Sequence, residues 1–274
     1  MDSGSIICLN GKYLAAGEAA VSACDGAVLY GMGLFETIKL TGGKPARTDL
    51  HLSRLMNSAR ALGLKVPFSA EKINEMLYGT AEKNNIKAGA LRLTLTAGGD
   101  AAAPSVIINV RQQVYSKEKY ARGIRAGFTK FRRNETSPLV RHKNLNYYEN
   151  IIAKRQAASC GWDEALFLNQ QGFIAEGSVS NIFIVGGGNV ITPDVNSGLL
   201  PGITRRRIID ICFSMGISLE ERPVRPEELF SSDECFVTNS LMGVMPLAAV
   251  DDRAIGSGLP GEITTALFRE LENQ

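Results

Sequence analysis

The sequence has few of the residues and segments that mark metal sites, disulfide frameworks and membrane proteins. Its 274 residues include only two histidines, and no metal-ligand spacing joins them, so no zinc site is expected. The five cysteines are scattered without a C-x-x-C pair, which favours reduced thiols in a cytoplasmic protein. No basic segment followed by an apolar run opens the chain, and no apolar run approaches the roughly 18 residues of a membrane span. We therefore expect neither a secretory signal nor a transmembrane helix.

The chain also lacks an excess of charge of either sign. It has 30 Lys and Arg residues against 28 Asp and Glu residues, which leaves a formal net charge of +2. The densest cations are Arg205–Arg207 and Arg132–Arg133, and a solvated helix face explains the triplet without a polyanionic partner. Because no longer basic run occurs, binding of nucleic acid is not expected.

Hydrophobic residues make up 45% of the chain, which is enough to bury the core of one large or two medium domains. Asn10–Gly11 lies between two short apolar segments, a pattern typical of a β-hairpin. Apolar residues at helical spacing predict a helix over 49–62, with Asp49 as its N-cap, and a second helix over 69–85. The other helices expected are 147–159, one from Ile203 onward, and 260–272.

The predicted strands cluster in two parts of the chain and do not alternate steadily with helices. This clustering favours an α+β fold over a doubly wound parallel sheet. The polar segment 116–123 ends in glycine and separates the two groups of strands. We therefore predict a small N-terminal domain over 1–116, an interdomain connection over 117–123 and a larger C-terminal domain over 124–274. The strands expected are 90–99, 105–114, 124–131, 163–169, 172–178, 180–193, 235–239 and 244–250.

Lys143 is a candidate nucleophile in the segment "RHKNLNYYEN" (141–150). Schiff-base chemistry needs an unprotonated amine on a positioned side chain, and neighbouring cations such as Arg141 and His142 promote that state. A single lysine is nevertheless far more often a solvated surface residue. The segment alone therefore leaves both interpretations open.

Glu176 stands near a predicted strand end in "GFIAEGSVSNIFIV" (172–185), between apolar residues and Gly177. A carboxylate buried there would be costly unless it met a positive partner, and a protonated pyridine nitrogen would serve as one. A solvent-facing glutamate on a strand is an equally open interpretation.

Two turns could bind phosphate. In "LLPGITRRRIID" (199–210), Ile203 and Thr204 open a helix whose first amide groups lack partners and attract anions. In "FVTNSLMGVMP" (236–246), Ser240 lies in a polar turn after a strand and could form a second wall of the same anion site. An ordinary capped helix would show the same residues as the first segment, and an ordinary strand-to-loop turn the same residues as the second. A Schiff-base lysine, a carboxylate for a ring nitrogen and two phosphate-binding turns together describe a pyridoxal phosphate site.

The chain resembles the fold-type IV pyridoxal-phosphate enzymes, which include branched-chain aminotransferases, D-amino acid aminotransferases and 4-amino-4-deoxychorismate lyases. The resemblance covers nearly the whole chain and implies a small N-terminal α/β domain, a larger C-terminal α/β pseudobarrel domain, a cofactor between them and a homodimer. It rests on the segments "YGMGLFETIKL" (30–40), "HLSRL" (51–55), "HKNLNYYENIIAKRQA" (142–157), "GWDEALFLNQQGFIAEGSVSNIFIV" (161–185), "LLPGITRRRII" (199–209) and "TNSLMGVMP" (238–246).

The resemblance implies a role for each matching residue. Lys143 binds the cofactor as a Schiff base, Glu176 keeps the pyridine nitrogen protonated, and Arg54 in "HLSRL" reaches the phosphate. Tyr148 occupies a position where the aminotransferases often have a tyrosine at the phenolic oxygen, but lyases and D-specific enzymes commonly have an aliphatic residue. The phosphate contacts implied by the two turns come from Ile203 and Thr204 and from Ser240 and Leu241.

Thr37, in "FET", separates the branches of the resembled family best. Branched-chain enzymes typically have glycine there, whereas a threonine could pass a proton to the pyruvate that leaves in the lyase reaction. A hydroxyl also has ordinary uses, such as bonding its own backbone. "TNSLMGVMPL" also resembles the lyases, and Asn146 is shared by lyases and D-amino acid aminotransferases, whereas Tyr30 matches a branched-chain pocket tyrosine.

The expected activity is a pyridoxal-phosphate-dependent 4-amino-4-deoxychorismate lyase that eliminates pyruvate and gives 4-aminobenzoate for folate biosynthesis. The alternative is a branched-chain or D-amino acid aminotransferase that uses 2-oxoglutarate. Tyr30, Arg92 and Arg141 are candidates for holding the small-molecule substrate because they lie in or near the motif segments. A cofactor-free Schiff-base enzyme or a non-catalytic binding protein would leave Glu176 and both turns unexplained.

Overall fold

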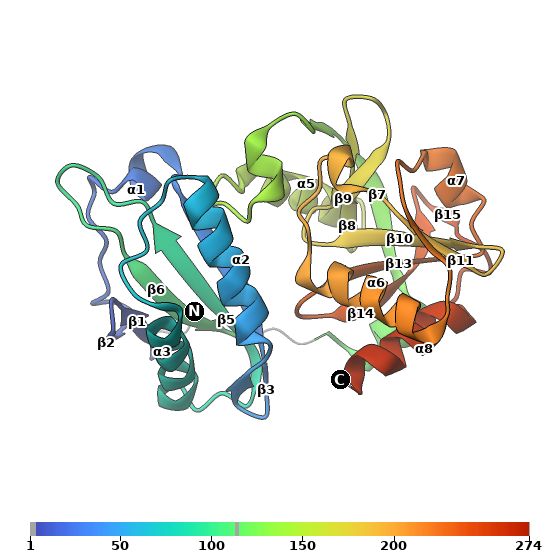
Figure 1. The fold of residues 1–274 in the computed structure, drawn as a ribbon. Coiled ribbons are helices and arrows are strands. Elements are labelled where there is room, and N and C mark those ends of the chain that lie inside the picture. Colours follow the sequence, from blue (N-terminus) through green and yellow to red (C-terminus); the bar gives the residue numbers. More distant parts are fainter. Residues whose placement is uncertain (1–3, 113–114, 274) are drawn as a thin grey trace. The chain divides into compact units, whose positions relative to one another are not determined.

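The computed structural model describes residues 4–112 and 115–273, which divide into two compact units (Figure 1). The first unit holds the described residues up to 112 together with His142–Asn146, and the second holds Tyr115–Arg141 and the residues from Tyr147 onward. The short segment 142–146 therefore belongs to the first unit although the chain on both sides of it belongs to the second.

The first unit is a six-stranded antiparallel sheet with the strand order β2-β1-β6-β5-β3-β4. Helices α2 and α3 pack on one face of this sheet. A five-residue helix, α1, precedes β3. The elements are β1 (Ile6–Leu9), β2 (Lys12–Ala15), α1 (Gly26–Tyr30), β3 (Gly33–Thr41), β4 (Lys44–Pro45), α2 (Thr48–Ala61), α3 (Ala70–Lys83), β5 (Ala88–Thr96) and β6 (Val106–Arg111).

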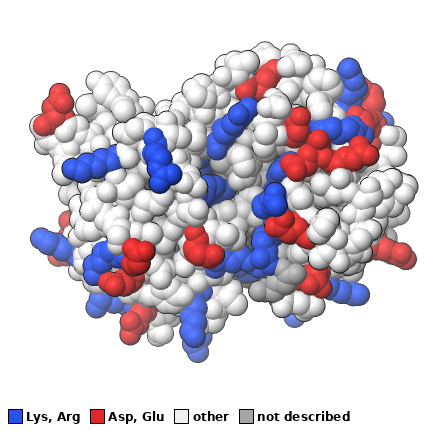
Figure 2. All heavy atoms as spheres, viewed as in Figure 1, with Lys and Arg blue, Asp and Glu red and all other residues white. Residues whose placement is uncertain are grey.

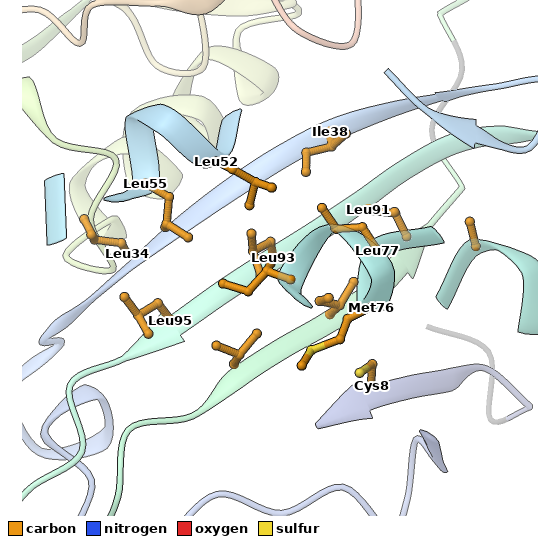
Figure 3. Packing of buried hydrophobic residues seen from close by; sticks show 14 of the residues in the cluster. Cys8, Leu34, Ile38, Leu52, Leu55, Met76, Leu77, Leu91, Leu93 and Leu95 are labelled. Atoms are coloured by element: carbon orange, nitrogen blue, oxygen red, sulfur yellow. The ribbon is translucent and has the colours of Figure 1, made fainter. Parts of the chain in front are cut away.

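Alternation along β3 decides which side chains face the helices. Leu34, Ile38 and Leu40 are buried against Leu52 and Leu55 of α2 and belong to one apolar cluster (Figure 3). Because successive strand residues point to opposite faces, the odd-numbered residues 35, 37 and 39 lie on the face away from the helices. The predicted residue Thr37 lies on this helix-free face.

The second unit has a nine-stranded mixed sheet with the path β12-β11-β10-β13-β14-β7-β8-β9, and β15 pairs with β14. The pairs β11–β12, β14–β7 and β7–β8 are parallel, and the others are antiparallel. The strands are β7 (Ile124–Arg133), β8 (Glu164–Asn169), β9 (Ile174–Gly177), β10 (Asn181–Gly186), β11 (Asn189–Thr192), β12 (Leu219–Glu221), β13 (Glu234–Asn239), β14 (Gly243–Val250) and β15 (Arg253–Ala254).

Apolar clusters cover the second sheet. Phe183 of β10 and Phe236 of β13 stack with ring centres 4.8 Å apart, and α6 and α8 pack over them. Helix α5 packs on Phe167 of β8 through its alanines. The helices are α4 (Lys117–Arg122), α5 (Tyr148–Ser159), α6 (Ile203–Met215), α7 (Pro226–Phe230) and α8 (Glu262–Glu272), with short 3-10 turns at Pro138–Arg141 and Val195–Ser197.

The predicted α+β fold in two domains is confirmed, and three local details differ from the expectation. Helix α2 begins one residue earlier, so Arg47 is its N-cap and Asp49 lies in the first turn. Residues 117–122, expected in the interdomain connection, form α4 within the second unit. Helices α1 and α7 have only five residues each, too few for apolar periodicity to reveal them. Residues 113–114 of the expected strand 105–114 lie outside the described residues.

Acidic and basic side chains both occur on the face shown in Figure 2, in keeping with the small net charge of +2. Within residues 4–112 and 115–273, no helix combines the length and apolar character that crossing a membrane requires. Over the same ranges, no three His, Cys, Asp or Glu side chains form a group able to hold a metal ion.

Candidate active site

Residues 142–146 add a short antiparallel segment alongside the start of β3. The amide of Phe35 donates to the carbonyl of Lys143 at 2.8 Å, and the amide of Leu145 donates to the carbonyl of Gly33 at 3.0 Å. With this register, alternation puts the Lys143 side chain on the same face as Phe35, away from α2. The backbone of the first unit therefore fixes where the Lys143 side chain starts and which way it points.

The Phe35 ring carries two cations on the helix-free face. Lys143 Nζ lies 4.3 Å from the ring centre, and Arg92 Cζ lies 3.8 Å from it, both within the range of a cation–π contact. Thr37 follows Phe35 on the same face of β3 and pairs directly with Arg92 of β5. Three predicted residues, Lys143, Thr37 and Arg92, thus share one face of one sheet.

Arg54 lies on the other side of β3, where α2 covers the sheet. Its Nε and Nη2 donate to the two carboxylate oxygens of Glu36 at 2.8 and 2.7 Å. His51 Nδ1 lies 2.6 Å from Glu36 Oε2, and Glu36 is only 1% exposed. Burial alone would raise the pKa of Glu36, but the Arg54 guanidinium and the His51 ring outweigh it and lower the pKa to about 2. Glu36 is therefore a carboxylate at any physiological pH.

Glu176 is a buried carboxylate at the end of β9, 8% exposed, with partners on both of its oxygens. Oε1 lies 3.2 Å from Arg133 Nη2, an ion pair, and Oε2 accepts from the amide of Leu200 at 2.9 Å. Arg133 is itself fixed, because its guanidinium lies 4.0 Å from the centre of the Phe167 ring and pairs with Glu149 at 3.0 Å. The negative charge of Glu176 is thus held in one orientation.

The first predicted phosphate turn is tied to Glu176 through Leu200. Asn181 Nδ2 donates to the Leu200 carbonyl at 2.9 Å, so both backbone polar groups of Leu200 are held three residues before α6 begins. Gly202 is the N-cap of α6, and no side chain caps it. A Cβ at Gly202 would lie 2.1 Å from Asn181 Oδ1, so the close approach requires glycine. The amides at Ile203 and the buried Thr204 therefore open a helix whose N-terminus has no side-chain cap.

The second predicted turn joins β13 to β14 and adjoins the same part of the chain. Asn239 Nδ2 donates to the Val179 carbonyl at 3.1 Å, and Asn239 Oδ1 accepts from the amide of Leu241 at 2.9 Å. Ser240 lies between them, half-buried. The Leu241 amide, expected at the phosphate, is thus engaged within its own turn. Both turns contact the residues that follow Glu176 in sequence.

A buried hydroxyl without a partner lies beside these turns. Thr238 pairs in register with Asn181 across β13 and β10, so their side chains share a face. Thr238 Oγ1 is buried and has no hydrogen-bond partner among the described residues. The orphaned buried hydroxyl and the helix N-terminus without a side-chain cap supply donors, and the fixed Glu176 carboxylate supplies acceptors. Together these groups fit a ligand with both a cationic ring nitrogen and a phosphate.

The contacts described above do not involve the other predicted residues. Tyr148 is the first residue of α5 and is 68% exposed, and Tyr30 ends α1 with 71% of its surface exposed. Arg141 lies in the second unit, where its Nη2 donates to Asn196 Oδ1 at 3.1 Å.

Sequence reasoning missed two residues around Glu176. The sequence around Arg133 does not indicate which carboxylate it pairs with. That partner is set by the pairing of β7, β8 and β9, which no short segment reveals. Tyr147 was passed over in favour of Tyr148, yet its hydroxyl donates to the Ser178 carbonyl at 2.9 Å, two residues after Glu176. The cost of burying a carboxylate predicted that some cation would be near, but not which one.

Comparison with known proteins defines the class. The family model described as amino-transferase class IV matches residues 33–250, and the chain therefore belongs to this family. The aminodeoxychorismate lyase of Bacillus subtilis (strain 168) is 33% identical over 272 residues, covering 96% of this chain and 92% of that protein.

Two solved structures share the whole fold. The branched-chain amino acid aminotransferase of Escherichia coli has a TM-score of 0.92 at 26% identity, covering 98% of this chain and 94% of that one. A second branched-chain amino acid aminotransferase, from T.th. and solved with pyridoxamine 5'-phosphate, has a TM-score of 0.90 at 28% identity, covering 98% and 93%. These relatives confirm the resemblance found in the sequence, and they include both a lyase and aminotransferases.

Proposed function

We propose that this protein is a pyridoxal-phosphate-dependent 4-amino-4-deoxychorismate lyase that releases pyruvate and forms 4-aminobenzoate for folate biosynthesis. One observation carries the proposal: Thr37 lies on the same face of β3 as Phe35, whose ring contacts Lys143. Two residues along a strand are about 7 Å apart, so the Thr37 side chain is the next along this face after the ring that contacts the amine. A branched-chain aminotransferase has no use for a proton donor at this point.

The cofactor would be held by the residues that the resemblance assigns to it. Lys143 would bond to its aldehyde, Glu176 would bond to the ring nitrogen, and Arg54 would pair with the phosphate. The α6 N-terminus at Ile203 and Thr204 and the turn at Ser240 would complete the phosphate site, while the Leu241 amide holds that turn together through Asn239. Bound in this way, pyridoxal phosphate supplies a cationic ring that accepts the electron pair left on the substrate carbon.

The chain's own residues would then move two protons. Lys143 would take the proton from the amine-bearing carbon of the substrate. The C–O bond to the enolpyruvyl group breaks, and Thr37 gives a proton to the departing pyruvate oxygen. The six-membered ring of the substrate becomes aromatic. Glu176 would pair with the ring nitrogen of the cofactor and favour its protonated form.

The charge of the helix-free face supports a substrate with two carboxylates. Lys39 pairs with Ala90 and Ala90 with Arg111, so two more cations lie on the face that carries Thr37 and Arg92. The only acidic residue within β3, β5 and β6 is Glu36, which faces α2. Aminodeoxychorismate carries two carboxylates, whereas a branched-chain amino acid carries one carboxylate and an apolar side chain.

The second candidate is a branched-chain or D-amino acid aminotransferase that uses 2-oxoglutarate. Tyr30 favours the branched-chain form, since it matches a substrate-pocket tyrosine of the resembled enzymes. In this reaction, Lys143 would return the proton to the cofactor side and no leaving group would need a donor at position 37.

We also propose that the protein acts as a homodimer in the cytoplasm. Helix α1 and the residue after its C-cap expose apolar side chains, including Val28 at 60%, Leu29 at 55% and Met32 at 47%. Such a patch on a soluble protein favours burial against a second copy. Light scattering coupled to size exclusion should give twice the chain mass of 29.5 kDa.

The decisive assay supplies chorismate, glutamine and an aminodeoxychorismate synthase, and it measures 4-aminobenzoate and pyruvate together. Equal amounts of both products, dependent on this protein and lost in Lys143→Ala, are expected. A parallel assay follows loss of branched-chain or D-amino acids in the presence of 2-oxoglutarate. Rapid transamination without 4-aminobenzoate would replace the lyase with the second candidate.

A further inference from the structure

We propose that Glu36 and His51 are positioning residues that hold the Arg54 guanidinium in the orientation that binds the cofactor's phosphate. The inference deepens the proposed function and rests on its phosphate role for Arg54. It gives a role to two residues for which the proposed cofactor contacts and proton transfers have none.

The geometry of the three side chains fixes the guanidinium plane. Nε and Nη2 of Arg54 bond side-on to both oxygens of Glu36, at 2.8 and 2.7 Å. Two parallel bonds to one carboxylate set the rotation of a guanidinium as well as its position. A single hydrogen bond would leave the plane free to turn.

His51 fixes the carboxylate in turn. It lies three residues before Arg54 on α2, so the two side chains rise from the same face of the helix. His51 Nδ1 contacts the Oε2 atom that also accepts from Arg54 Nη2, and both His51 and Glu36 are almost completely buried. Because a carboxylate oxygen can only accept, this bond is donated by His51 Nδ1. Glu36 therefore cannot swing away when the guanidinium meets an anion.

Holding α2 on the sheet does not need this arrangement. Leu52 and Leu55 of the same helix already pack into the apolar cluster with Leu34 and Ile38 (Figure 3). Burying a carboxylate and a guanidinium together is at best weakly stabilising compared with apolar packing of similar size. A fixed guanidinium orientation, in contrast, reduces the entropy lost when a phosphate binds.

Paired ligands separate this role from a merely structural one. Apoprotein is titrated with pyridoxal 5'-phosphate and, in parallel, with pyridoxal, which has the aldehyde and ring nitrogen but no phosphate. Absorbance of the lysine-bound cofactor reports both affinities. For Glu36→Gln, we expect the affinity for pyridoxal 5'-phosphate to fall about tenfold or more, with the affinity for pyridoxal unchanged within about twofold. Glu36→Asp keeps the charge but shortens the reach, and it should give an intermediate loss with the same selectivity.

Two further variants complete the design. Combining Glu36→Gln with Arg54→Gln should weaken phosphate binding no more than Arg54→Gln alone, because the carboxylate acts only through the guanidinium. Thr80→Val removes a buried hydrogen bond to Met76 in α3 of the same unit and serves as the control for general loosening. It should change both affinities equally or not at all.

Equal losses for both ligands in Glu36→Gln and Glu36→Asp, or no loss for either, would overturn the positioning role while leaving the cofactor assignment intact. A parent protein that binds neither ligand would refute the proposed function and this role with it. None of these readouts requires lyase turnover, so a wrong substrate assignment would not alter them.

Discussion

Lys143 and Phe35 meet twice, once through their backbones and once through their side chains. The Phe35 amide donates to the Lys143 carbonyl at 2.8 Å, and Lys143 Nζ lies 4.3 Å from the Phe35 ring centre. Phe35 therefore positions both the backbone of Lys143 and the amine at the end of its side chain. Arg92 lies on the same ring at 3.8 Å, so Phe35 also brings a second basic side chain close to Lys143.

Phe35→Leu should slow turnover much more than it destabilises the fold. The smaller side chain removes the platform for both cations, and we expect turnover to fall about tenfold. The free energy of unfolding should fall by about 1 kcal/mol, measured with urea. Phe183→Leu, in the core of the second unit, is the control, with a similar loss of stability and unchanged turnover. If both variants kept full activity, the ring would have no role in presenting Lys143.

Thr37→Gly should abolish most of the pyruvate release without displacing the cofactor. Loss of a positioned proton donor typically costs about 10²-fold or more in rate, so turnover to 4-aminobenzoate should fall by about that factor. Thr37→Ser keeps the hydroxyl and should retain most of the activity. The cofactor absorbance band should match the parent in both variants. Lyase turnover in Thr37→Gly equal to that of the parent would reject Thr37 as the donor.

Glu176→Gln should lower both turnover and stability. A neutral amide no longer favours protonation of the ring nitrogen, so we expect turnover to fall about a hundredfold. Arg133 would lose one of its two carboxylates inside the fold, which should cost about 2 kcal/mol in urea unfolding. Glu149→Gln removes the other, more exposed carboxylate and should cost less than about 1 kcal/mol with activity intact. Equal effects of the two substitutions would argue against a role for Glu176 at the cofactor.

Acid should destabilise the parent more steeply than Glu36→Gln. Although burial opposes it, pairing with Arg54 and His51 lowers the Glu36 pKa from 4.5 to about 2 in the native protein. The stabilisation from the ionised carboxylate is therefore complete above the unfolded pKa and is lost as the pH falls towards 2. Between pH 6 and pH 3 the parent should lose about 2 kcal/mol more unfolding free energy than the variant. Parallel pH dependences would contradict the pairing.

Local sequence patterns predicted most of the helices and strands, but they predicted few of the contacts between them. The Asn10–Gly11 hairpin and the α3 cap at Ser69 are present because their signals act over four residues or fewer. The Glu36–Arg54 pair and the Glu176–Arg133 pair depend on which strand lies beside which, and no short segment encodes that. The same reason hid the membership of residues 142–146 in the first unit.

The candidate site divides in the same way. The residue types at 143, 176 and 203–204 were enough to suggest the chemistry. Pyridoxal phosphate needs an amine for its aldehyde, a carboxylate for its ring nitrogen and backbone amides for its phosphate, and few other ligands need all three. The supporting contacts, such as Asn181 and Glu176 holding Leu200, could be found only in the folded chain. Thr37 and Arg92 could be named from the sequence, but their direct pairing required the register of β3 and β5.

The central claim is that Lys143 is the residue that bonds to pyridoxal phosphate, and borohydride tests it most directly. The protein loaded with the cofactor is reduced with borohydride, digested and examined by peptide mass spectrometry. The account predicts loss of the visible absorbance band and a phosphopyridoxyl group on the peptide that contains Lys143, with no such group in Lys143→Ala. A label on another lysine, or a visible band that persists in Lys143→Ala, would contradict it.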